Sequence, residues 1–538
     1  MTYEQAGGGF AGLGIRTETG DTLTLRDRLT HHYTTGMSTV EVSSQNANRV
    51  VDEFEKYYRD NLSNPPGTYK TYIIKADNNA DKLARLAAWM DSHGIKYGHP
   101  AAGKATRGYD FSSQNTGAVS YTSQDIVVNT FQSKSRFITT AFEPTSKLSD
   151  SVTYDITAWN LMYAYGLKGY ALTERINPVR SFTPPTQHVA PADKPYAYIL
   201  KYQTLEDVAF VASLLNQGVK LRAAKTPFTI SGENFAMGAV LALRGDNKNT
   251  TDFDTKVKTA AKAADRRLYT STTGFVDKGK DFGSGDMMYL QAPRIATLVG
   301  DQTSSLSAGE VWHFFEQQIH YPVTQIGTDY FRNVDLSAYD VLIVPSGYYR
   351  MFDESTLADL GEWVSGGGRL ILISNAVAAF ADKKGFGLTQ YASEEEKRAA
   401  EKKEEAAKQK EGLLAYKDAE RFYIQETIAG AIYKVTLDTS HPLAYGMTGS
   451  YYTLKTGELY YSLLQDDWNV GRIAGKARPV QGFSGHKINA KLDNTVIFGV
   501  EEKGGGTIIY MVDNPLFRCF WEEGKMIFAN AVFMVGNN

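Results

Sequence analysis

The sequence predicts a multidomain α/β protein, and three observations support this fold class. At 538 residues, the chain is several times longer than an average domain of roughly 150 residues, so about three or four domains are expected. Strand-like and helix-like segments alternate along residues 292–373, which is typical of a parallel sheet covered by helices on both faces. The preceding region contains two strand–helix–strand patterns and therefore predicts a mixed α/β middle part.

The composition is that of a globular chain. Hydrophobic residues make up 42% and charged residues 22%, and the 48 glycines, 33 tyrosines and 26 phenylalanines indicate many turns and strands. Because the formal net charge is −3, no excess of positive charge is available to hold a phosphate backbone, and we expect no nucleic-acid partner.

The cysteine content and the lengths of the apolar stretches limit the kinds of metal site and membrane association that we expect. The single cysteine, Cys519, cannot form an internal disulfide or a multi-thiolate metal site, so a metal would need His and carboxylate ligands. No stretch approaches the roughly 18 to 20 apolar residues of a membrane span, and we expect no membrane partner. The chain starts in a Gly-rich loop with no preceding strand or helix, so we expect that residue 1 is not the natural edge of a domain.

The N-terminal residues predict helices. Residues 22–59 have helical spacing, with Asp21 or Thr22 as the N-cap and a second helical run from about Ser44. The sequence Asn-Pro-Pro-Gly at residues 64–67 then ends the helical segment.

Two later segments, residues 68–100 and 196–227, can be aligned element by element. Both predict a strand, a helix and a second short strand after a turn glycine. The aligned positions are Tyr72–Lys75 with Tyr198–Lys201, Leu83-Ala84 with Val208-Ala209, and His93–Lys96 with Gln217–Lys220. Two interpretations stay open, an internal duplication and two independent units that share an apolar period.

The rest of the middle region and the last region are predicted as follows. Strands and loops dominate residues 105–150 and 228–290, with a helix at about 252–268. Further predicted strands are 294–299, 323–326, 341–344, 370–373, 432–437, 496–500 and 507–512, and further predicted helices are 307–319, 355–364 and 522–535. The charged run 393–412 predicts a solvated helical insertion at about 390–420, with a lid or partner-binding arm as the alternative.

The N-terminal residues also resemble a known family. The stretch TYEQAGGG followed by the TLTLRDRLTHHYTTGMSTVEV helix resembles the end of the catalytic domain of zinc metallocarboxypeptidases of the carboxypeptidase A type. By this resemblance Glu4 corresponds to the general base beside the zinc-bound water. The family's zinc ligands lie upstream of that glutamate and are absent here, so the resemblance implies zinc for the family and no cofactor for this chain alone.

Three other segments carry the same resemblance to large bacterial members, namely 154–167, 305–316 and 513–518. The resemblance implies three parts: the C-terminal strand and helices of a truncated carboxypeptidase-like domain at 1–62, a mixed middle region at 63–290, and a last domain at 291–538. It also implies a peptide or protein substrate cleaved through the missing peptidase part, and export to the periplasm or the cell exterior. The oligomeric state stays open.

The last domain resembles class I glutamine amidotransferases in the order of its elements. In that family a nucleophilic Cys follows a central strand, whereas here the strand 370–373 leads into Ser374-Asn375, and no His-x-Glu follows. We therefore expect no glutaminase chemistry, and the aromatic neighbours of Cys519 favour a structural thiol. Ser374-Asn375 and Pro345-Ser346-Gly347 are still expected at carboxyl ends of strands, where such sheets bind ligands.

One further cluster could hold a metal in principle. His313, Glu316 and His320 fall within about 60° of one another on a predicted helix. Apolar residues such as Phe315 define the opposite face, so we expect the three polar side chains to face water.

Two hypotheses for the function follow. The first is the non-catalytic C-terminal portion of a zinc metallocarboxypeptidase-like protein. The alternative is a non-enzymatic ligand-binding or scaffold protein that uses a degenerate amidotransferase-like domain.

Overall fold

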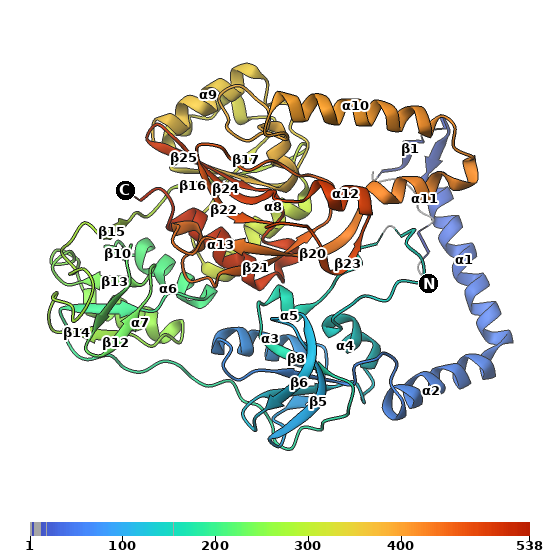
Figure 1. Cartoon of the computed structure of the whole chain (residues 1–538), viewed down its shortest axis with the longest axis horizontal. Coiled ribbons are helices and arrows are strands. Elements are labelled where there is room, and N and C mark those ends of the chain that lie inside the picture. Colours follow the sequence, from blue (N-terminus) through green and yellow to red (C-terminus); the bar gives the residue numbers. More distant parts are fainter. Residues whose placement is uncertain (1–2, 5–11, 18, 154, 538) are drawn as a thin grey trace. The chain divides into compact units, whose positions relative to one another are not determined.

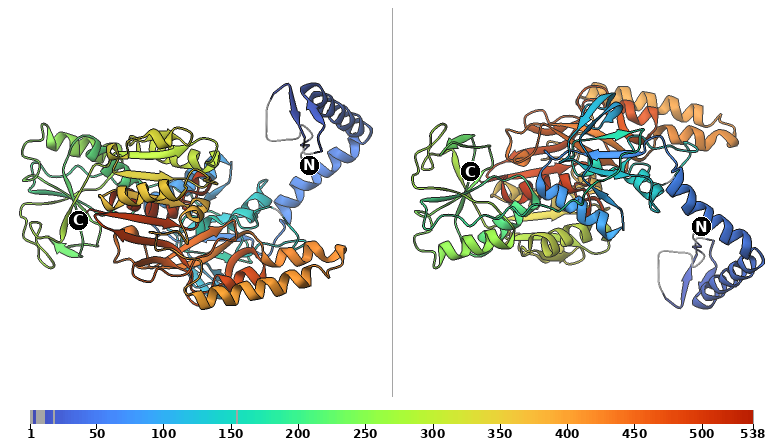
Figure 2. Two further views of the ribbon diagram at one scale, coloured as in Figure 1. Left: turned by 90° about the horizontal axis from the view of Figure 1, so that it is seen from above. Right: turned by 90° about the horizontal axis from the view of Figure 1, so that it is seen from below.

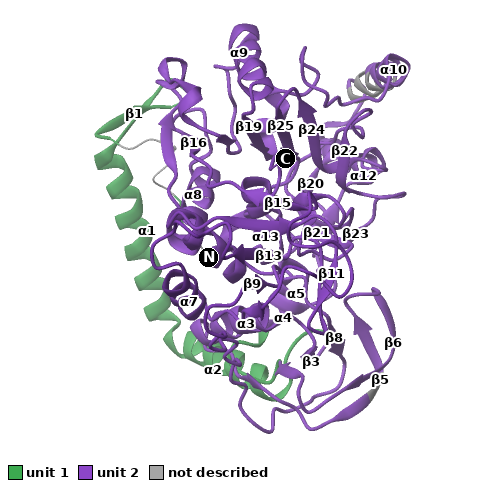
Figure 3. Cartoon of the chain, turned by 90° about the vertical axis from the view of Figure 1, so that its left-hand side faces the viewer, with its two compact units in different colours: residues 1–68, 130–137 green, residues 69–129, 138–538 purple. Residues whose placement is uncertain are grey.

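The computed structural model describes residues 3–4, 12–17, 19–153 and 155–537. The chain divides into two compact units, residues 1–68 with 130–137 and residues 69–129 with 138–538 (Figure 3). Within the described parts, no helix has both the length and the apolar character needed to cross a membrane.

The first unit contains a small antiparallel pair of strands and two helices. These elements are β1 (Gly14–Arg16), β2 (Thr22–Thr24), α1 (Leu25–Gln45) and α2 (Ala47–Ser63). The predicted N-cap at Asp21 or Thr22 is wrong, because residues 22–24 pair with β1 and the helix begins one residue after Thr24. The Thr24 hydroxyl accepts a hydrogen bond from the Asp27 amide, and the Asp27 carboxylate accepts one from the Thr24 amide. The second helix begins at Ala47, after Asn46, rather than near Ser44.

Both helices of the first unit expose apolar side chains. On α1, Leu29 is 63% exposed and Tyr33 is 70% exposed, and on α2 Phe54 is 62% exposed. Among the described residues of these helices, Asn61 alone is buried. The helices therefore present an apolar surface that the rest of their own unit leaves uncovered.

In the second unit, the segment after the first helices forms an antiparallel sheet, here called the first sheet. Its strand order is β4-β7-β3-β8-β5-β6. The strands are β3 (Thr71–Ile74), β4 (Tyr97–Gly98), β5 (Gly103–Asp110), β6 (Asn115–Tyr121), β7 (Ile126–Asn129) and β8 (Gly169–Leu172), and the helices along this segment are α3 (Ala80–Ser92), α4 (Ser135–Phe142) and α5 (Leu161–Ala164). The strand β3 is fully buried because its short apolar run is covered on both faces.

The second sheet follows with the order β14-β9-β13-β10-β15, again with antiparallel neighbours. Its strands are β9 (Ala197–Leu200), β10 (Leu221–Ala224), β13 (Val240–Leu243), β14 (Tyr269–Ser271) and β15 (Met287–Leu290), and its helices are α6 (Leu205–Asn216) and α7 (Phe253–Ala263). A separate hairpin, β11 (Phe228–Ile230) with β12 (Glu233–Phe235), lies between β10 and β13 in the chain. In both views of Figure 2 this green region stands beside the yellow-to-red C-terminal region.

The two sheets share their central order. In each sheet, the two strands of the strand–helix–strand unit lie on opposite sides of a third strand, which is antiparallel to both. In the first sheet β3 and β4 flank β7, and in the second sheet β9 and β10 flank β13. A fourth strand then pairs with the outer side of the first one, β8 with β3 and β14 with β9. This is the split β-α-β arrangement of ferredoxin-like folds, and it is the arrangement that an internal duplication would produce.

The last region, coloured yellow to red in Figure 1, forms the C-terminal sheet. Its parallel part has the order β17-β16-β18-β19-β25. These strands are β16 (Ile295–Val299), β17 (Thr324–Gly327), β18 (Val341–Val344), β19 (Arg369–Ile373) and β25 (Gly506–Met511). The order continues as β24-β22-β20-β21 in antiparallel pairs, and β23 also pairs with β20. These strands are β20 (Ile428–Leu437), β21 (Ser450–Lys455), β22 (Trp468–Arg472), β23 (Pro479–Ser484) and β24 (Val496–Lys503).

Helices cover both faces of the parallel part. On one face Val311 of α8 (Ser305–His313) belongs to the same apolar core as Ile343 and Ile371, and on the other face Leu360 of α9 (Glu354–Ser365) belongs to the core that contains Leu342. Alternate residues of each strand therefore enter different apolar cores, which is why the strands are continuous apolar runs. The predicted fold class, a multidomain α/β protein ending in a doubly wound parallel sheet, is confirmed.

The remaining α-helices belong to the same C-terminal region. They are α10 (Glu394–Glu411), α11 (Ala419–Tyr423), α12 (His486–Lys491) and α13 (Glu522–Phe533). The charged insertion is a helix, and Figure 2 shows α10 and α11, in orange, projecting away from the sheet.

Candidate functional site

A pocket of about 550 Å³ lies at the carboxyl ends of the parallel strands and is here called the edge pocket. Residues that follow four strands line it, together with the first turn of α8 and the segment after β21. The lining residues after the parallel strands include Ser304, Ser346, Tyr348, Ser374, Asn375, Val512, Asp513 and Asn514. A volume of this size is in the range of small-molecule sites.

The strand order places the topological switch point of the sheet at this edge. The chain connects β16 to β17 through α8, which packs on one face, and connects β18 to β19 through α9, which packs on the other face. The loops after β16 and β18 therefore diverge, and the sheet has its topological switch point between these two strands. Open α/β sheets bind ligands in the crevice at such a point.

Backbone hydrogen bonds tie the two diverging loops together. The Ser304 amide donates to the Ser346 carbonyl at 2.8 Å, and the Ser346 amide donates to the Ser307 hydroxyl at 3.0 Å. Gly347 allows this approach, because a Cβ on it would lie 2.3 Å from the Gln302 carbonyl oxygen. The serine hydroxyls thus come from a rim that is fixed in the fold.

Ser374 follows β19 directly and has a backbone φ of +53°, a left-handed conformation that serine adopts rarely. A short 3-10 helix, Ser374–Ala379, begins there, and its Ala376 and Val377 are buried. Non-glycine residues in this region of the backbone store strain and occur often at functional sites. The strand, sharp turn and helix place the Ser374 side chain at the pocket wall.

A buried carboxylate forms the inner side of the pocket. Glu310 of α8 is 7% exposed and accepts hydrogen bonds from the Asn514 side-chain amide and from the Arg518 backbone amide, both at 2.6 Å. Burial raises the pKa of Glu310 above its usual value, while the two hydrogen bonds act in the opposite direction. Glu310 therefore fixes the loop after β25 against α8.

A buried charge pair holds β21 beside the pocket. Asp513 accepts a hydrogen bond from the Thr453 hydroxyl and one from the Lys455 ammonium, each at 2.8 Å. The side chains of Lys455 and Asp513 are 1% and 7% exposed. Because these charges neutralise each other, Asp513 brings little net charge to the pocket.

An aromatic cluster holds the Arg518 guanidinium at the pocket. Its central carbon lies 5.2 Å from the ring centre of Trp159 and 5.3 Å from that of Phe517. Arg518 and Cys519 both have positive φ, +47° and +60°, so the chain is tightly turned there. Burial and the nearby Glu310 raise the pKa of the Cys519 thiol, and the half-buried thiol agrees with a structural role.

The sequence located only part of this site. It placed Ser346, Ser374 and Asn375 at strand ends, and the structure brings these residues to one pocket. Glu310, Asn514 and Arg518 were not singled out, although they lie within two of the segments that carry the family resemblance. Trp159, from the third such segment, contacts Arg518, so the co-occurrence of these segments was the available signal.

Glu4 lies elsewhere, in the first unit. It is exposed and outside any strand or helix, and its neighbour Tyr3 accepts a hydrogen bond from the Thr39 hydroxyl of α1 at 3.2 Å. Most of the Gly-rich loop after it falls outside the described residues. The role of Glu4 as a general base, and with it the zinc peptidase hypothesis, stays a prediction.

The described residues contain no group of three or more His, Cys, Asp or Glu side chains that could hold a metal ion. His313 ends α8, residues Phe314–Ile319 form a π-helix, and His320 has a φ of +52°. The wider helical turn breaks the regular spacing on which the predicted common face depended. Glu316 and His320 are exposed, whereas His313 is half-buried and its Nδ1 has no hydrogen-bond partner among the described residues.

Comparisons with known proteins add a likeness of fold. No family model matches the chain, and no curated protein matches its sequence. A protein assigned as a component of GMP synthase from Thermoplasma acidophilum is similar in structure, with 12% identity and a TM-score of 0.28, over 44% of this chain and 92% of that one. A glutamine amidotransferase from Thermotoga maritima is similar with 8% identity and a TM-score of 0.27, over 44% of this chain and 96% of that one.

A ThuA-like protein from Bacteroides uniformis is similar with 11% identity and a TM-score of 0.26, over 45% of this chain and 90% of that one. The neighbours thus include a protein assigned to GMP synthase and a glutamine amidotransferase. At these scores the likeness carries no argument about the fold or the activity of this chain.

Proposed function

We propose that the C-terminal domain binds a small polar molecule in the edge pocket and does so without chemistry. The observation that carries this proposal is the position of the pocket at the switch point between β16 and β18, with hydroxyl and amide side chains after successive strands. The proposal is a more specific form of the alternative function considered from the sequence, a non-enzymatic ligand-binding protein.

The side chains indicate the chemistry of the ligand. Hydroxyl groups of Ser304, Ser346 and Ser374 and the amides of Asn375 and Asn514 can each donate or accept hydrogen bonds. The charged lining residues are Glu310, Glu458, Asp513 and Arg518, of which Asp513 is neutralised by Lys455. We therefore expect a molecule rich in hydroxyl or amide groups rather than an apolar one or a strong polyanion.

Binding is favoured over catalysis by the residues that are present. A serine nucleophile needs a base within hydrogen-bond reach, which is most often a histidine. The described lining residues include neither histidine nor cysteine. Glu310 already accepts two hydrogen bonds within the protein, and Asp513 is paired with Lys455.

The test is a thermal-shift and calorimetric screen of the whole chain with monosaccharides, sugar acids, amino acids and nucleosides. At least one class should raise the unfolding temperature of the wild type, because a ligand that binds only the folded state stabilises it. Ser346→Leu, which fills the rim without adding charge, should lower the affinity for that compound more than tenfold. The substitution Ser355→Leu, at an exposed position of α9 outside the pocket, is the control.

Two results would contradict the proposal. One is the absence of binding by every class at millimolar concentration. The other is a compound that binds Ser346→Leu as tightly as the wild type, since its site would then lie elsewhere.

A further inference from the structure

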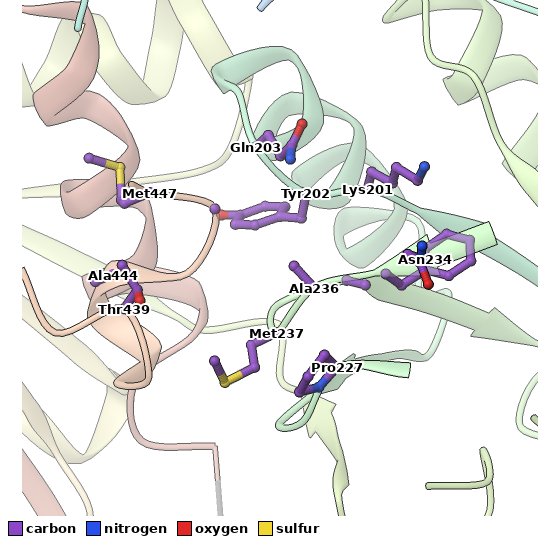
Figure 4. A pocket seen from close by; sticks show the side chains of 13 residues that line it. Lys201, Tyr202, Gln203, Pro227, Asn234, Ala236, Met237, Thr439, Ala444 and Met447 are labelled. Atoms are coloured by element: carbon purple, nitrogen blue, oxygen red, sulfur yellow. The ribbon is translucent and has the colours of Figure 1, made fainter. Parts of the chain in front are cut away.

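A second cavity, of about 520 Å³, lies against the second sheet and is here called the hairpin cavity (Figure 4). Three segments line it: the loop after β9, the β11–β12 hairpin with the residues on either side of it, and the loop after β20. It shares no lining residue with the edge pocket. The proposal below is therefore independent of the proposed function.

Apolar side chains form most of the wall. They include Pro227, Phe235 and the methionines Met237 and Met447, which come from different segments of the chain. Methionine side chains are unbranched and polarisable, so they adapt to ligands of different shape. Such a wall favours a flat or compact apolar body.

The cavity carries no uncompensated charge. Of the described residues that line it, Lys201 alone is charged, and its ammonium donates a hydrogen bond to Glu233 at 2.9 Å. The same ammonium lies 4.5 Å from the ring centre of Tyr269. Since Lys201 is already paired, a ligand needs no charge of its own.

One polar atom of the wall lacks a partner. Tyr202 is 3% exposed, and its buried hydroxyl makes no hydrogen bond among the described residues. Burial raises the pKa of Tyr202 above its usual value, so the hydroxyl keeps its proton and can donate a hydrogen bond to an acceptor. An unpaired buried hydroxyl is destabilising, and an acceptor supplied from the cavity would remove that cost.

The loop beside this hydroxyl is closely packed. Figure 4 shows the Tyr202 ring extending toward the loop that carries Ala444 and Met447. Gly446 in that loop has a φ of +77°, and a Cβ on it would lie 2.6 Å from the Tyr202 carbonyl oxygen. Met447 lies in the same loop and contributes an adaptable side chain to the cavity wall.

We propose that the hairpin cavity binds a small, uncharged, mainly apolar molecule with one hydrogen-bond acceptor, and that the Tyr202 hydroxyl donates to this acceptor. The apolar wall supplies most of the affinity and Tyr202 selects for the acceptor. The edge pocket, with its hydroxyl and amide groups, selects a different class of molecule.

The experiment uses the whole chain with ¹³C-labelled methionine methyl groups and three matched probes. Acetophenone has an aromatic body and a carbonyl acceptor, ethylbenzene lacks the acceptor, and benzoate adds a negative charge. Acetophenone should shift the methyl signals of Met237 and Met447, assigned through Met237→Leu and Met447→Leu. Ethylbenzene should bind roughly three- to tenfold more weakly, the contribution of one neutral hydrogen bond, and benzoate should not shift these signals.

Two variants separate ligand binding from folding. Tyr202→Phe should reduce the affinity for acetophenone to that for ethylbenzene without lowering the unfolding temperature, because it removes an unpaired hydroxyl. Ala236→Phe, at an exposed position of the cavity wall, should abolish the shifts caused by both neutral probes. Tyr330→Phe, at a 60% exposed tyrosine outside the cavity, is the matched control and should change nothing.

The proposal is overturned if neither neutral probe shifts the two methyl signals up to its solubility limit. It is also overturned if acetophenone and ethylbenzene bind the wild type equally, if benzoate binds as tightly as acetophenone, or if Ala236→Phe leaves the shifts unchanged.

Discussion

The first and second sheets have the same central strand order and put a hairpin at the same place in the chain. In each, the hairpin lies between the second and third of the four central strands, β5–β6 between β4 and β7, and β11–β12 between β10 and β13. In the first sheet β5 pairs with β8 and extends the sheet, whereas β11 and β12 pair only with each other among the named strands. The detached hairpin lines the hairpin cavity.

This difference shows that two sheets with the same central strand order can place the same hairpin differently. The strand–helix–strand core requires covered apolar faces and leaves little room for change, since β3 and β9 are buried along their whole length. The connection between the second and third strands carries no such requirement. A hairpin in this connection can pair with the edge of the sheet, as β5–β6 does, or stay separate from it and line a cavity, as β11–β12 does.

A buried arginine joins the two repeats of the strand–helix–strand pattern. Arg266, which follows α7, donates hydrogen bonds to Asp81 of α3 and Asp207 of α6, and all three side chains are at most 8% exposed. The Thr204 hydroxyl also donates to Asp81 at 2.7 Å. The N-terminal ends of the two equivalent helices are thus held by one guanidinium.

The largest effect is expected for Arg266→Leu. It leaves the carboxylates of Asp81 and Asp207 buried without their partner, and removal of one member of a buried ion pair costs about 3 to 5 kcal/mol. Urea unfolding followed by tryptophan fluorescence should show this loss, with Arg266→Lys less affected. A loss below about 1 kcal/mol would mean that the two repeats are held together by other contacts.

Replacement of each hairpin by a short Gly-Ser turn should sharpen the comparison. Without β5–β6, the edge of β8 loses its partner, so the amides of residues 170–172 should exchange faster with deuterated solvent. Without β11–β12, amides of β9 and β13 should keep their protection while acetophenone no longer shifts the Met447 signal. Equal loss of protection in both sheets would contradict the different roles of the hairpins.

The helix N-caps of the repeats should differ by a smaller amount. Thr204 caps α6 in a reciprocal arrangement with Asp207 and also bonds Asp81, whereas Asn79 caps α3 through the Asp81 amide alone. We expect Thr204→Ala to cost about 1 to 2 kcal/mol and Asn79→Ala about 0.5 to 1 kcal/mol in the free energy of unfolding. The reverse order would contradict the assignment of Thr204 to the contact between repeats.

The smallest effect is expected outside both sheets. Glu4 is exposed, so Glu4→Gln should change the unfolding free energy by no more than about 0.5 kcal/mol. This variant sets the background for the comparisons above. A larger change in thermal or urea unfolding would show that Glu4 has a structural contact.

Much of the fold was predictable because it depends on local patterns. The strand at residues 341–344 was predicted with its observed bounds, since a continuous apolar run marks a strand buried on both faces. The start of α1 was missed because residues 22–24 pair with β1, a contact that helix spacing does not record. The π-helix at 314–319 was missed because its wider turn has no signature in the apolar period.

The site was less predictable for a similar reason. Ser346 and Ser374 could be placed because they follow strands, and strand ends are local features. The bonds of Glu310 to Asn514 and to the Arg518 amide join residues about two hundred positions apart, and only the fold shows them. The hairpin cavity likewise depends on the packing of β11–β12 beside a loop from another sheet.

The most direct test of the proposed function is hydrogen–deuterium exchange of the whole chain with and without the polar compound found by the screen. We predict slower exchange in residues 302–308, 345–349, 374–379 and 512–519, the segments around the edge pocket. Protection confined to other segments, with these four unchanged, would contradict binding at the switch point of the C-terminal sheet.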